Sequence, residues 1–290
     1  MKKLLILSGK GGTGKTTTAA TFINFSKADA FADCDVDAPN LHIVTKMNTE
    51  PEESRYYGMD KAVIDPERCI GCESCLRSCR FDAIKKTGDH CEVNEFACEG
   101  CAVCAAVCPA DAVSMRRDAA GTLGLYREPE RVFATAELKM GRGNSGKLVT
   151  EVKNAMSDAA PDAELSIIDG SPGIGCPVIA SVTGVDMVLI ITEPSASGLS
   201  DLKRLIHTAG ILRVKAAVCV NKYDVCPKKA EEIKAYCLEQ GLPFTGFLPF
   251  DKKASHAINS GVSIADVDCP LRSALRQVYD KTMELLEEEK

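Results

Sequence analysis

The sequence predicts an α/β protein with a mostly parallel sheet and helices on both faces, interrupted by a small cysteine-rich α+β segment. The sheet is indicated by an apolar run at residues 2–7 that leads into a glycine-rich loop, and by later apolar runs that alternate with helical patterns. The inserted segment is indicated by eight of the fifteen cysteines, which lie between Cys69 and Cys108 in two runs of identical spacing. The 290 residues suffice for one large or two smaller domains, and 45% hydrophobic with 26% charged residues excludes a long disordered chain.

Composition excludes several partners. The formal net charge is -6, there is no Trp, and no long run of Lys and Arg occurs, which argues against nucleic-acid binding. No segment reaches the roughly 18 consecutive apolar residues of a membrane span. Residues 1–7 are too short for a signal peptide and lack a cleavage site, so they are interpreted as a strand. We therefore predict a cytoplasmic protein without membrane insertion, in which abundant thiols indicate metal binding rather than disulfides.

The first element pair is a strand at 2–7 and a helix at 16–25, joined by a loop. Residues 9–16, GKGGTGKT, fit the phosphate-binding pattern G-x-x-x-x-G-K-[ST]. Glycines let backbone N–H groups surround phosphate oxygens, and the helix N-terminus adds partial positive charge. We expect Lys15 to reach the β- and γ-phosphates of a nucleotide and the Thr16 hydroxyl to bind Mg²⁺. A glycine-rich turn without a ligand is the alternative. The nucleotide-binding candidates of this segment are Gly9, Gly11, Gly12, Thr13, Gly14, Lys15, Thr16 and Thr17.

The later elements keep the alternating order. An apolar stretch at 30–32 leads to an acidic segment with Asp33, Asp35 and Asp37. Strands that alternate with helices predict a parallel sheet covered on both faces. The further predicted elements are strands at 165–168, 187–191 and 216–220 and a terminal helix at 271–287.

Between residues 59 and 118 the sequence changes to cysteines, charges and short apolar stretches. We therefore predict an α/β domain formed by residues 1–58 and 119–290, with a small domain at 59–118 inserted into it. An inserted domain requires its two ends to lie close together at a surface site.

The phosphate loop has a second lysine, Lys10, and with it resembles the deviant Walker A loop of MinD/ParA-class P-loop ATPases, which include the nitrogenase iron protein. The resemblance implies binding of ATP and Mg²⁺ and hydrolysis of ATP to ADP and phosphate. It also implies an ATP-sandwich homodimer in which Lys10 reaches the partner's nucleotide. A solvated lysine is the alternative.

The same resemblance extends to two switch segments. Asp33-Cys34-Asp35 is similar to switch I, where Asp35 would orient the attacking water, and Asp37 stays open for that role. Residues 167–173, IIDGSPG, are similar to switch II, where Asp169 would hold Mg²⁺ through water. The implied catalytic residues are Lys10, Lys15, Asp35 and Asp169. The segments that resemble adenine-recognition segments contain Asn221, Lys222, Pro249, Phe250 and Asp251.

Both cysteine runs have the spacing C-x₂-C-x₂-C-x₃-C and resemble bacterial two-cluster ferredoxins. In that family three ligands of each cluster come from one run and the fourth comes from the other. The resemblance implies one [4Fe–4S] cluster on Cys69, Cys72, Cys75 and Cys108, and a second on Cys98, Cys101, Cys104 and Cys79. A structural zinc site is the alternative, although zinc sites usually use paired C-x₂-C units with longer gaps. Arg80 replaces the proline usual after the fourth cysteine, which leaves the potential of that cluster open.

The remaining cysteines lack ligand spacing, and most are predicted to pack in the core. Cys176 is different, because its position seven residues after Asp169 resembles that of a cluster ligand in the nitrogenase iron protein. The second such ligand has no counterpart here, so a transient cluster or redox role and simple packing both stay open for Cys176. The cysteines predicted to pack are Cys34, Cys91, Cys219, Cys226, Cys237 and Cys269.

The resemblances favour an ATP-dependent carrier or maturation factor for iron–sulfur clusters or metallocofactors, acting on a client protein. The alternative is an ATP-gated electron-transfer protein with a redox partner. The insert lies between the two switches, so coupling to ATP and a passive tether are both open. A MinD/ParA-type positioning ATPase is less favoured, because Glu284, Glu287, Glu288 and Glu289 make the tail acidic, whereas membrane-surface helices are basic.

Overall fold

The computed structural model describes residues 1–288 and confirms the predicted fold class; Glu289 of the predicted acidic tail lies outside the described residues. The chain divides into two compact units. Unit 1 comprises Met1–Glu53, Leu123–Glu137 and Gly146–Lys290, and unit 2 comprises Ser54–Thr122 and Leu138–Ser145. The predicted domain boundaries at 59–118 stay a prediction.

A nine-stranded sheet carries the order β13-β12-β11-β1-β10-β2-β9-β8-β3. All neighbouring strands from β13 to β9 pair in parallel. Because β1 lies between β10 and β11, the loop after β1 opens at the centre of the carboxyl edge of the sheet. The strands are β1 (Lys2–Leu7), β2 (Ala30–Asp33), β3 (Glu52–Tyr57), β8 (Ala119–Glu128), β9 (Arg131–Leu138), β10 (Leu165–Asp169), β11 (Met187–Thr192), β12 (Lys215–Asn221) and β13 (Phe244–Leu248).

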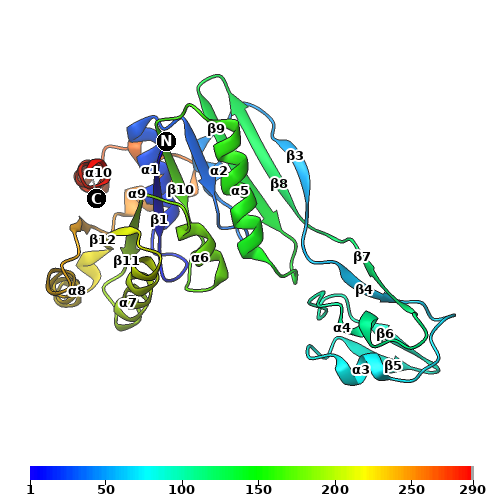
Figure 1. Ribbon diagram of the computed structural model, residues 1–290. Helices are drawn as coiled ribbons and strands as arrows, with labels where there is room; N and C mark the ends of the chain where they lie inside the picture. The colour runs from blue at the N-terminus through cyan, green and yellow to red at the C-terminus, as the bar shows by residue number, and fades with distance from the viewer. Residues whose placement is uncertain (289–290) are drawn as a thin grey trace. The chain divides into compact units, whose positions relative to one another are not determined.

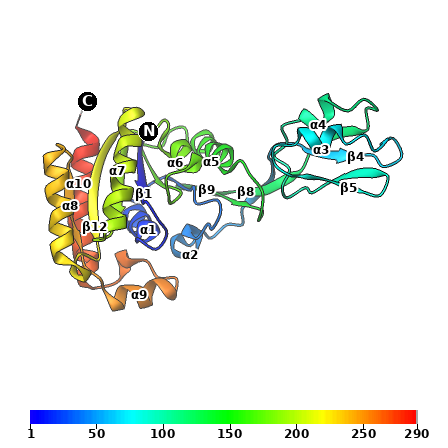
Figure 2. The same cartoon turned by 90° about the horizontal axis from the view of Figure 1, so that it is seen from below.

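Helices cover both faces of the parallel part of this sheet. Figures 1 and 2 show α5 and α6 on one face and α1 and α2 on the other. None of the helices within residues 1–288 is both long and apolar enough to cross a membrane. The helices of unit 1 are α1 (Lys15–Ser26), α2 (Leu41–Thr45), α5 (Ser145–Ala159), α6 (Cys176–Val182), α7 (Ala196–Ile211), α8 (Pro227–Glu239), α9 (Lys252–Asn259) and α10 (Pro270–Glu287), with 3₁₀ turns at Tyr223–Val225 and Ile264–Asp266.

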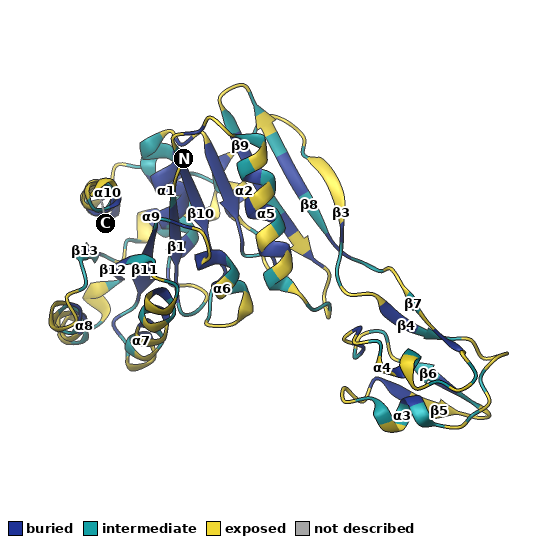
Figure 3. Cartoon of the chain, in the orientation of Figure 1, coloured by how far each residue is buried: buried dark blue, intermediate teal, exposed yellow. Residues whose placement is uncertain are grey.

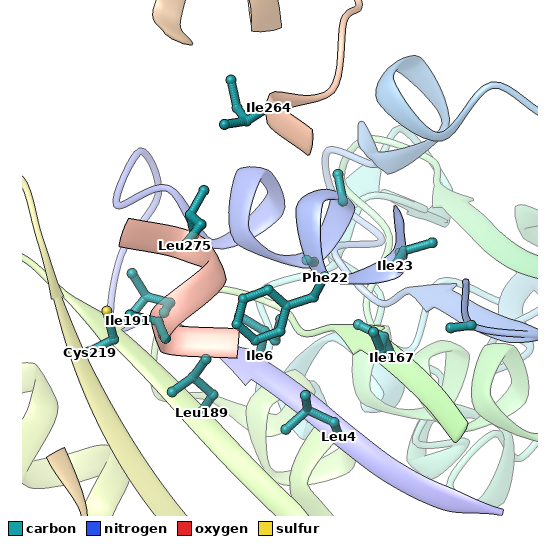
Figure 4. Close-up of a cluster of buried hydrophobic side chains, with 14 of the residues drawn as sticks. Leu4, Ile6, Phe22, Ile23, Ile167, Leu189, Ile191, Cys219, Ile264 and Leu275 are labelled. Atoms are coloured by element: carbon teal, nitrogen blue, oxygen red, sulfur yellow. The ribbon is translucent and has the colours of Figure 1, made fainter. Parts of the chain in front are cut away.

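The core explains why the central strands are apolar runs rather than alternating patterns. Successive strand residues point to opposite faces of a sheet. Leu4 and Ile6 therefore pack with Phe22 of α1 in one cluster (Figure 4), while Leu5 and Leu7 face the other side. All of these side chains are at most 1% exposed. Figure 3 shows the central strands almost entirely buried, as expected for a sheet covered on both faces.

Unit 2 contains two antiparallel strand pairs and two short helices. Its strands are β4 (Lys61–Ile64) with β7 (Val113–Arg116) and β5 (Ile84–Thr87) with β6 (His90–Val93), and its helices are α3 (Ser74–Ser78) and α4 (Val103–Ala106). Gly71 and Gly100 both have positive φ, and a Cβ at either would lie within 2.6 Å of a backbone oxygen. The core of unit 2 consists mainly of cysteines and small apolar side chains.

Candidate nucleotide site and cysteine cavities

Most of the predicted nucleotide-binding residues line one cavity of about 1030 Å³ at the carboxyl edge of the sheet. Gly9 and Lys10 are outside its lining. Gly9 instead supports packing, since a Cβ there would lie 2.2 Å from the Cβ of Asp201 in α7. The predicted residues that line the cavity are Gly11, Gly12, Thr13, Gly14, Lys15, Thr16, Thr17, Asp35, Asn221, Lys222, Pro249, Phe250 and Asp251.

Asn221 at the end of β12 fixes the phosphate loop from the side. Its Nδ2 donates a buried hydrogen bond of 2.7 Å to the carbonyl oxygen of Thr13. Gly14 has φ +90°, and a Cβ there would lie only 2.3 Å from that same Nδ2 atom. Glycine at this position therefore serves both the loop conformation and the approach of Asn221.

Lys222 makes a second link to the same loop. Its Nζ donates to the carbonyl oxygen of Gly12 at 2.9 Å and lies 2.6 Å from Oε1 of Glu193. Glu193 was absent from the sequence-based candidates, because its partner lies 29 residues away. Glu193, Lys222 and the phosphate loop are thus linked by hydrogen bonds and an ion pair at the end of the sheet.

Lys15, Thr16 and Asp169 converge beneath the loop. Lys15 Nζ lies 2.6 Å from Oδ1 of Asp169, and Thr16 Oγ1 donates to the other carboxylate oxygen at 2.6 Å. Lys15 is only 5% exposed and Asp169 is fully buried. Burial lowers the pKa of Lys15, but the charge and hydrogen bond of Asp169, with two further acids, raise it above its usual range. The cation therefore stays charged in a position suited to phosphate oxygens.

Asp33 organises the segment that resembles switch I. The sequence did not reveal this role of Asp33. It is fully buried and accepts backbone N–H groups from Asp35, Asn40 and Leu41 at 2.9–3.0 Å. Burial, followed by the charge of Asp169, raises the pKa of Asp33 to about 7, although its backbone hydrogen bonds oppose this shift. One carboxylate thus holds both ends of the loop at residues 34–40.

Asp35 and Asp37 differ in their surroundings. Asp35 Oδ2 lies 3.8 Å from Lys15 Nζ, and its side chain is 14% exposed. Burial raises the pKa of Asp35 to about 6, against the opposing charge of Lys15. Asp37 also lines the cavity but is exposed. The geometry brings Asp35, and not Asp37, into contact with the phosphate-loop lysine.

The two switch segments are joined by backbone hydrogen bonds through Cys34. Its N–H donates to the carbonyl oxygen of Asp169 at 2.8 Å, and its own carbonyl oxygen accepts the Ser171 hydroxyl. Gly173 N–H donates to Ser8 O at the start of the phosphate loop at 3.0 Å. A movement of either switch segment therefore displaces hydrogen-bond partners in the other.

Lys153 ties α5 to the helix that follows switch II. Its Nζ donates to the carbonyl oxygens of Ala180, Ser181 and Thr183, at the end of α6. Burial lowers the pKa of Lys153 to about 8, while nearby Cys34 opposes the shift. The start of α5 also contacts α6, since a Cβ on Gly146 would lie 3.2 Å from the Cys176 carbonyl oxygen. Cys176 itself is exposed, at the first residue of α6.

Lys10 and the adenine-like segment complete the placement of the predicted residues. Lys10 Nζ donates to Ser197 Oγ at 2.9 Å on the exposed side of the loop. Phe250 N–H donates to Asp224 Oδ1 at 2.8 Å, and Asp251 caps α9. These contacts hold Phe250 and Asp251 at the wall of the cavity.

The eight spaced cysteines separate into two small cavities in unit 2. Each cavity contains three cysteines of one run and the last cysteine of the other, which is the grouping that the ferredoxin resemblance implied. The first is lined by Cys69, Cys72, Cys75 and Cys108, and the second by Cys79, Cys98, Cys101 and Cys104. Cys91 lines the first cavity as a fifth cysteine.

These cavities fit the chemistry of a four-thiolate cluster. In each four-cysteine set one cysteine is exposed, Cys72 or Cys101, and the other three are buried or partly buried. The Ser74 hydroxyl lowers the pKa of Cys72 by hydrogen bonding, which favours the thiolate that metals bind. Within residues 1–288 no three His, Cys, Asp or Glu side chains converge as ligands of a single metal ion.

Five of the six cysteines predicted to pack in the core are buried, and Cys226 is partly buried. All fifteen cysteines lie within the described residues and are free thiols.

Comparisons with known proteins agree with both the predicted P-loop fold and the predicted 4Fe-4S domain. Residues 62–115 match a family described as a 4Fe-4S dicluster domain. The chain is 34% identical to the uncharacterized protein MJ0578 of Methanocaldococcus jannaschii, over 98% of this chain and 97% of that protein. It is 25% identical to an iron-sulfur cluster carrier protein of Pyrococcus horikoshii, over 99% and 87% of the two chains.

Among solved structures, the septum site-determining protein MinD of Pyrococcus horikoshii, complexed with Mg-ADP, superposes with a TM-score of 0.56. The superposition covers 99% of this chain and 97% of that chain at 14% identity. The predicted MinD/ParA-type P-loop fold with an additional 4Fe-4S domain is thereby confirmed.

Proposed function

This chain belongs to the same family as MJ0578 of Methanocaldococcus jannaschii, and from that premise we propose that it is an ATP-dependent carrier or maturation factor for iron–sulfur clusters or metallocofactors. The observation that carries the proposal is the joint presence of two four-cysteine cavities and a complete phosphate-loop cavity in one chain. The names of more distant relatives, an iron-sulfur cluster carrier protein and a cytosolic Fe-S cluster assembly factor, support it.

The nucleotide half of the proposal assigns roles by position. Backbone N–H groups of Gly11 to Thr17 surround the phosphates, Lys15 neutralises them, and Thr16 binds Mg²⁺ with Asp169 nearby. Asp35 orients the attacking water, and hydrolysis yields ADP and phosphate. Asn221 and Lys222 hold the loop in register with the adenine-binding wall at 249–251.

The cluster half assigns one [4Fe–4S] cluster to each cysteine cavity, within an inserted domain at residues 59–118. A bound cluster supplies one-electron redox capacity and exchangeable iron. The chain's own residues hold it through three sulfurs of one run and one of the other. The exposed ligands, Cys72 and Cys101, leave a side on which a client's thiols can approach.

We propose a homodimer because Lys10 lies on the exposed side of its own loop, where it can reach a partner's nucleotide. The client is a protein that accepts clusters or electrons, in a reducing cytoplasm that keeps the fifteen cysteines out of disulfides.

The test is cluster transfer under nucleotide control. Protein prepared anaerobically would be mixed with an apo-ferredoxin, and holo-ferredoxin formation followed by circular dichroism with and without MgATP. A carrier transfers clusters at a rate that MgATP changes, and Lys15→Ala abolishes that change while Lys228→Ala, an exposed lysine on α8, preserves it. Equal rates with and without MgATP in the wild type would contradict ATP control.

A second function, ATP-gated electron transfer, is favoured by the buried cysteines of both cavities, which suit clusters that are kept rather than given away. It predicts a nucleotide-dependent shift of a cluster midpoint potential in an EPR titration with a non-hydrolysable MgATP analogue. A shift without any cluster transfer would replace the carrier proposal with this one.

A further inference from the structure

The two cysteine cavities are related by an internal repeat. Each cysteine of the second run lies 29 positions after its counterpart, as Cys98 does after Cys69. The backbone repeats too: Glu73 and Ala102 have φ of 60° and 61°, and each directly precedes the helix of its run. One half of unit 2 therefore serves as a built-in comparison for the other.

The apolar side chains that line the cavities also correspond by this repeat. The first cavity, defined by Cys69, Cys72, Cys75 and Cys108, is lined by Ile64, Ala112, Val113 and Cys91. The counterparts in the second cavity are Val93, Ala83, Ile84 and Ala62. Three of the four pairs are apolar in both cavities, and one of these three is alanine in both. The fourth pair, Cys91 and Ala62, differs in kind, because only the cysteine can donate or accept a hydrogen bond.

Cys91 is placed to use that ability. It lies on β6, is 1% exposed, and packs in the same buried cluster as Cys75. Its side chain and that of Cys75 line the same small cavity. Cys75 is buried as well, so a contact between the two thiols is shielded from bulk water.

We propose that Cys91 donates its S–H to the sulfur of Cys75 in the first cluster site and thereby raises the reduction potential of that cluster alone. The inference rests on the proposed assignment of Cys75 as a ligand. A hydrogen bond to a ligand sulfur withdraws electron density and stabilises the reduced, more negative state. Cys91 acts through Cys75 and is therefore a positioning residue that makes the two sites unequal.

A different polar contact marks the second site. Lys61 is buried and its Nζ donates to the backbone carbonyl oxygen of Cys98, and its counterpart in the repeat is His90. This contact does not involve a sulfur atom. It is the same in wild type and in Cys91 variants, so it cancels when their potentials are compared.

The test compares Cys91→Ala, Cys91→Ser and Ala62→Cys in the full chain, with iron content and EPR-monitored redox titration as readouts. In Cys91→Ala one midpoint should fall, so that at fixed potential the reduced-to-oxidised ratio of that cluster drops severalfold. A tenfold drop corresponds to 59 mV for a one-electron couple. Cys91→Ser keeps an O–H donor and should retain most of the wild-type midpoint. Ala62→Cys, the mirror substitution, should raise the other midpoint.

Three outcomes would overturn the proposal: unchanged midpoints in Cys91→Ala, an equal shift of both midpoints, or loss of iron from Cys91→Ala. The last result would make Cys91 a ligand. Ala62→Cys keeps the proposal testable if Cys91→Ala fails to fold, because a rise of the first midpoint, or of neither, contradicts the mirror relation. Failure of the proposed function is distinguishable: wild-type protein that binds no cluster gives no EPR signal, whereas protein that binds clusters without transferring them still gives the two midpoints compared here.

Discussion

Single residues decide how the phosphate loop meets the acids around it. Lys15 contacts Asp169 closely and Asp35 more loosely, while Asp37 stays exposed at the cavity wall. The resemblance of the sequence favoured Asp35 and left Asp37 open for the same role, because both follow the same strand. The structural distinction comes from a lysine that lies twenty residues away in the sequence.

Asp35 should impose an acid limit on ATP hydrolysis. Its pKa lies at about 6, so kcat/KM for ATP should fall as the pH drops through that value and the carboxylate takes up a proton. Asp35→Asn should lower kcat by at least tenfold, whereas Asp37→Asn should keep both rate and profile. Steady-state phosphate release between pH 5 and 8 measures this. A normal rate in Asp35→Asn together with loss in Asp37→Asn would reverse the assignment.

Asn221 should control nucleotide affinity without taking part in chemistry. Asn221→Ala removes the donor to the Thr13 carbonyl oxygen, which costs roughly 1–3 kcal/mol when a buried acceptor loses its partner. That loss corresponds to a weaker Kd for a non-hydrolysable ATP analogue by about fivefold or more. Isothermal titration measures the Kd, with exposed Lys228→Ala as control. Equal affinities in both variants would exclude a role for the Asn221 contact.

At the scale of elements, α5 and α6 form a linked pair behind the switches. The segment Leu138–Ser145 belongs to unit 2 and runs directly into α5, and Lys153 of α5 holds the last carbonyl oxygens of α6. Switch II runs directly into α6. The chain thus has a covalent and hydrogen-bonded route from the cysteine unit to the nucleotide site.

Lys153→Met should loosen this pair. Three carbonyl oxygens lose a shared donor, so we expect a loss of about 1–3 kcal/mol in the free energy of unfolding. Lys147→Met, on the same helix but with an exposed side chain, should change it by less than about 0.5 kcal/mol. Urea unfolding monitored by circular dichroism measures both.

The difference in free energy of unfolding between wild type and Lys153→Met should change with pH in a defined direction. The pKa of Lys153 is depressed to about 8 in the fold, so between about 8 and 10.5 the unfolded chain binds more protons than the native one. Wild-type stability relative to Lys153→Met should therefore rise as the pH increases from 8 to 10. If the difference in free energy of unfolding between wild type and Lys153→Met became smaller over this interval, the burial of the Lys153 cation would be contradicted.

Elements buried on both faces were predictable, and the edge of the sheet was not. β1, β10, β11 and β12 were predicted because each is a nearly continuous apolar run. β3, in contrast, has the sequence EESRYY with mostly exposed side chains, so nothing in its pattern indicates a strand. Its place in the sheet depends on pairing with a strand more than sixty residues later, which local propensity does not encode.

The candidate site divides in the same way. Cysteine and glycine spacing indicated the cysteines of the two cavities and the phosphate loop, because each is a local motif. Glu193, Asp33 and Lys153 were missed, because their roles arise from contacts between segments that only the folded chain brings together.

At the scale of the whole molecule, the two units differ in what holds them together. Unit 1 has a large apolar core, whereas the core of unit 2 consists largely of the cysteines themselves. A small domain of this kind obtains much of its folding free energy from the metal it binds.

Removal of iron should therefore affect the two units unequally. After anaerobic treatment with a chelator, residues 62–115 should lose amide hydrogen-exchange protection by an order of magnitude or more, while β1, β10 and β11 keep theirs. Hydrogen exchange with mass spectrometry resolves both regions. Uniform loss across both units, or none in residues 62–115, would contradict this separation.

Dimer formation should depend on Lys10. In an Asp35→Asn background, which preserves bound ATP, MgATP should convert the chain from monomer to dimer in sedimentation velocity. Adding Lys10→Ala should prevent this conversion at the same nucleotide concentration, while Lys203→Ala on α7 should not. A dimer that persists without Lys10 would leave the lysine with its Ser197 contact alone.

The strand order also fixes a sequence of events during synthesis. β1 is translated before the cysteine-rich segment, but both of its neighbours, β10 and β11, are translated only after the whole of that segment. The cysteines of each cavity are close together along the chain, whereas the central sheet requires contacts across more than 150 residues. The nascent chain therefore presents all eight cysteines of the two cavities while its nucleotide site does not yet exist, so under the proposed function a newly made molecule can acquire metal before it can respond to ATP.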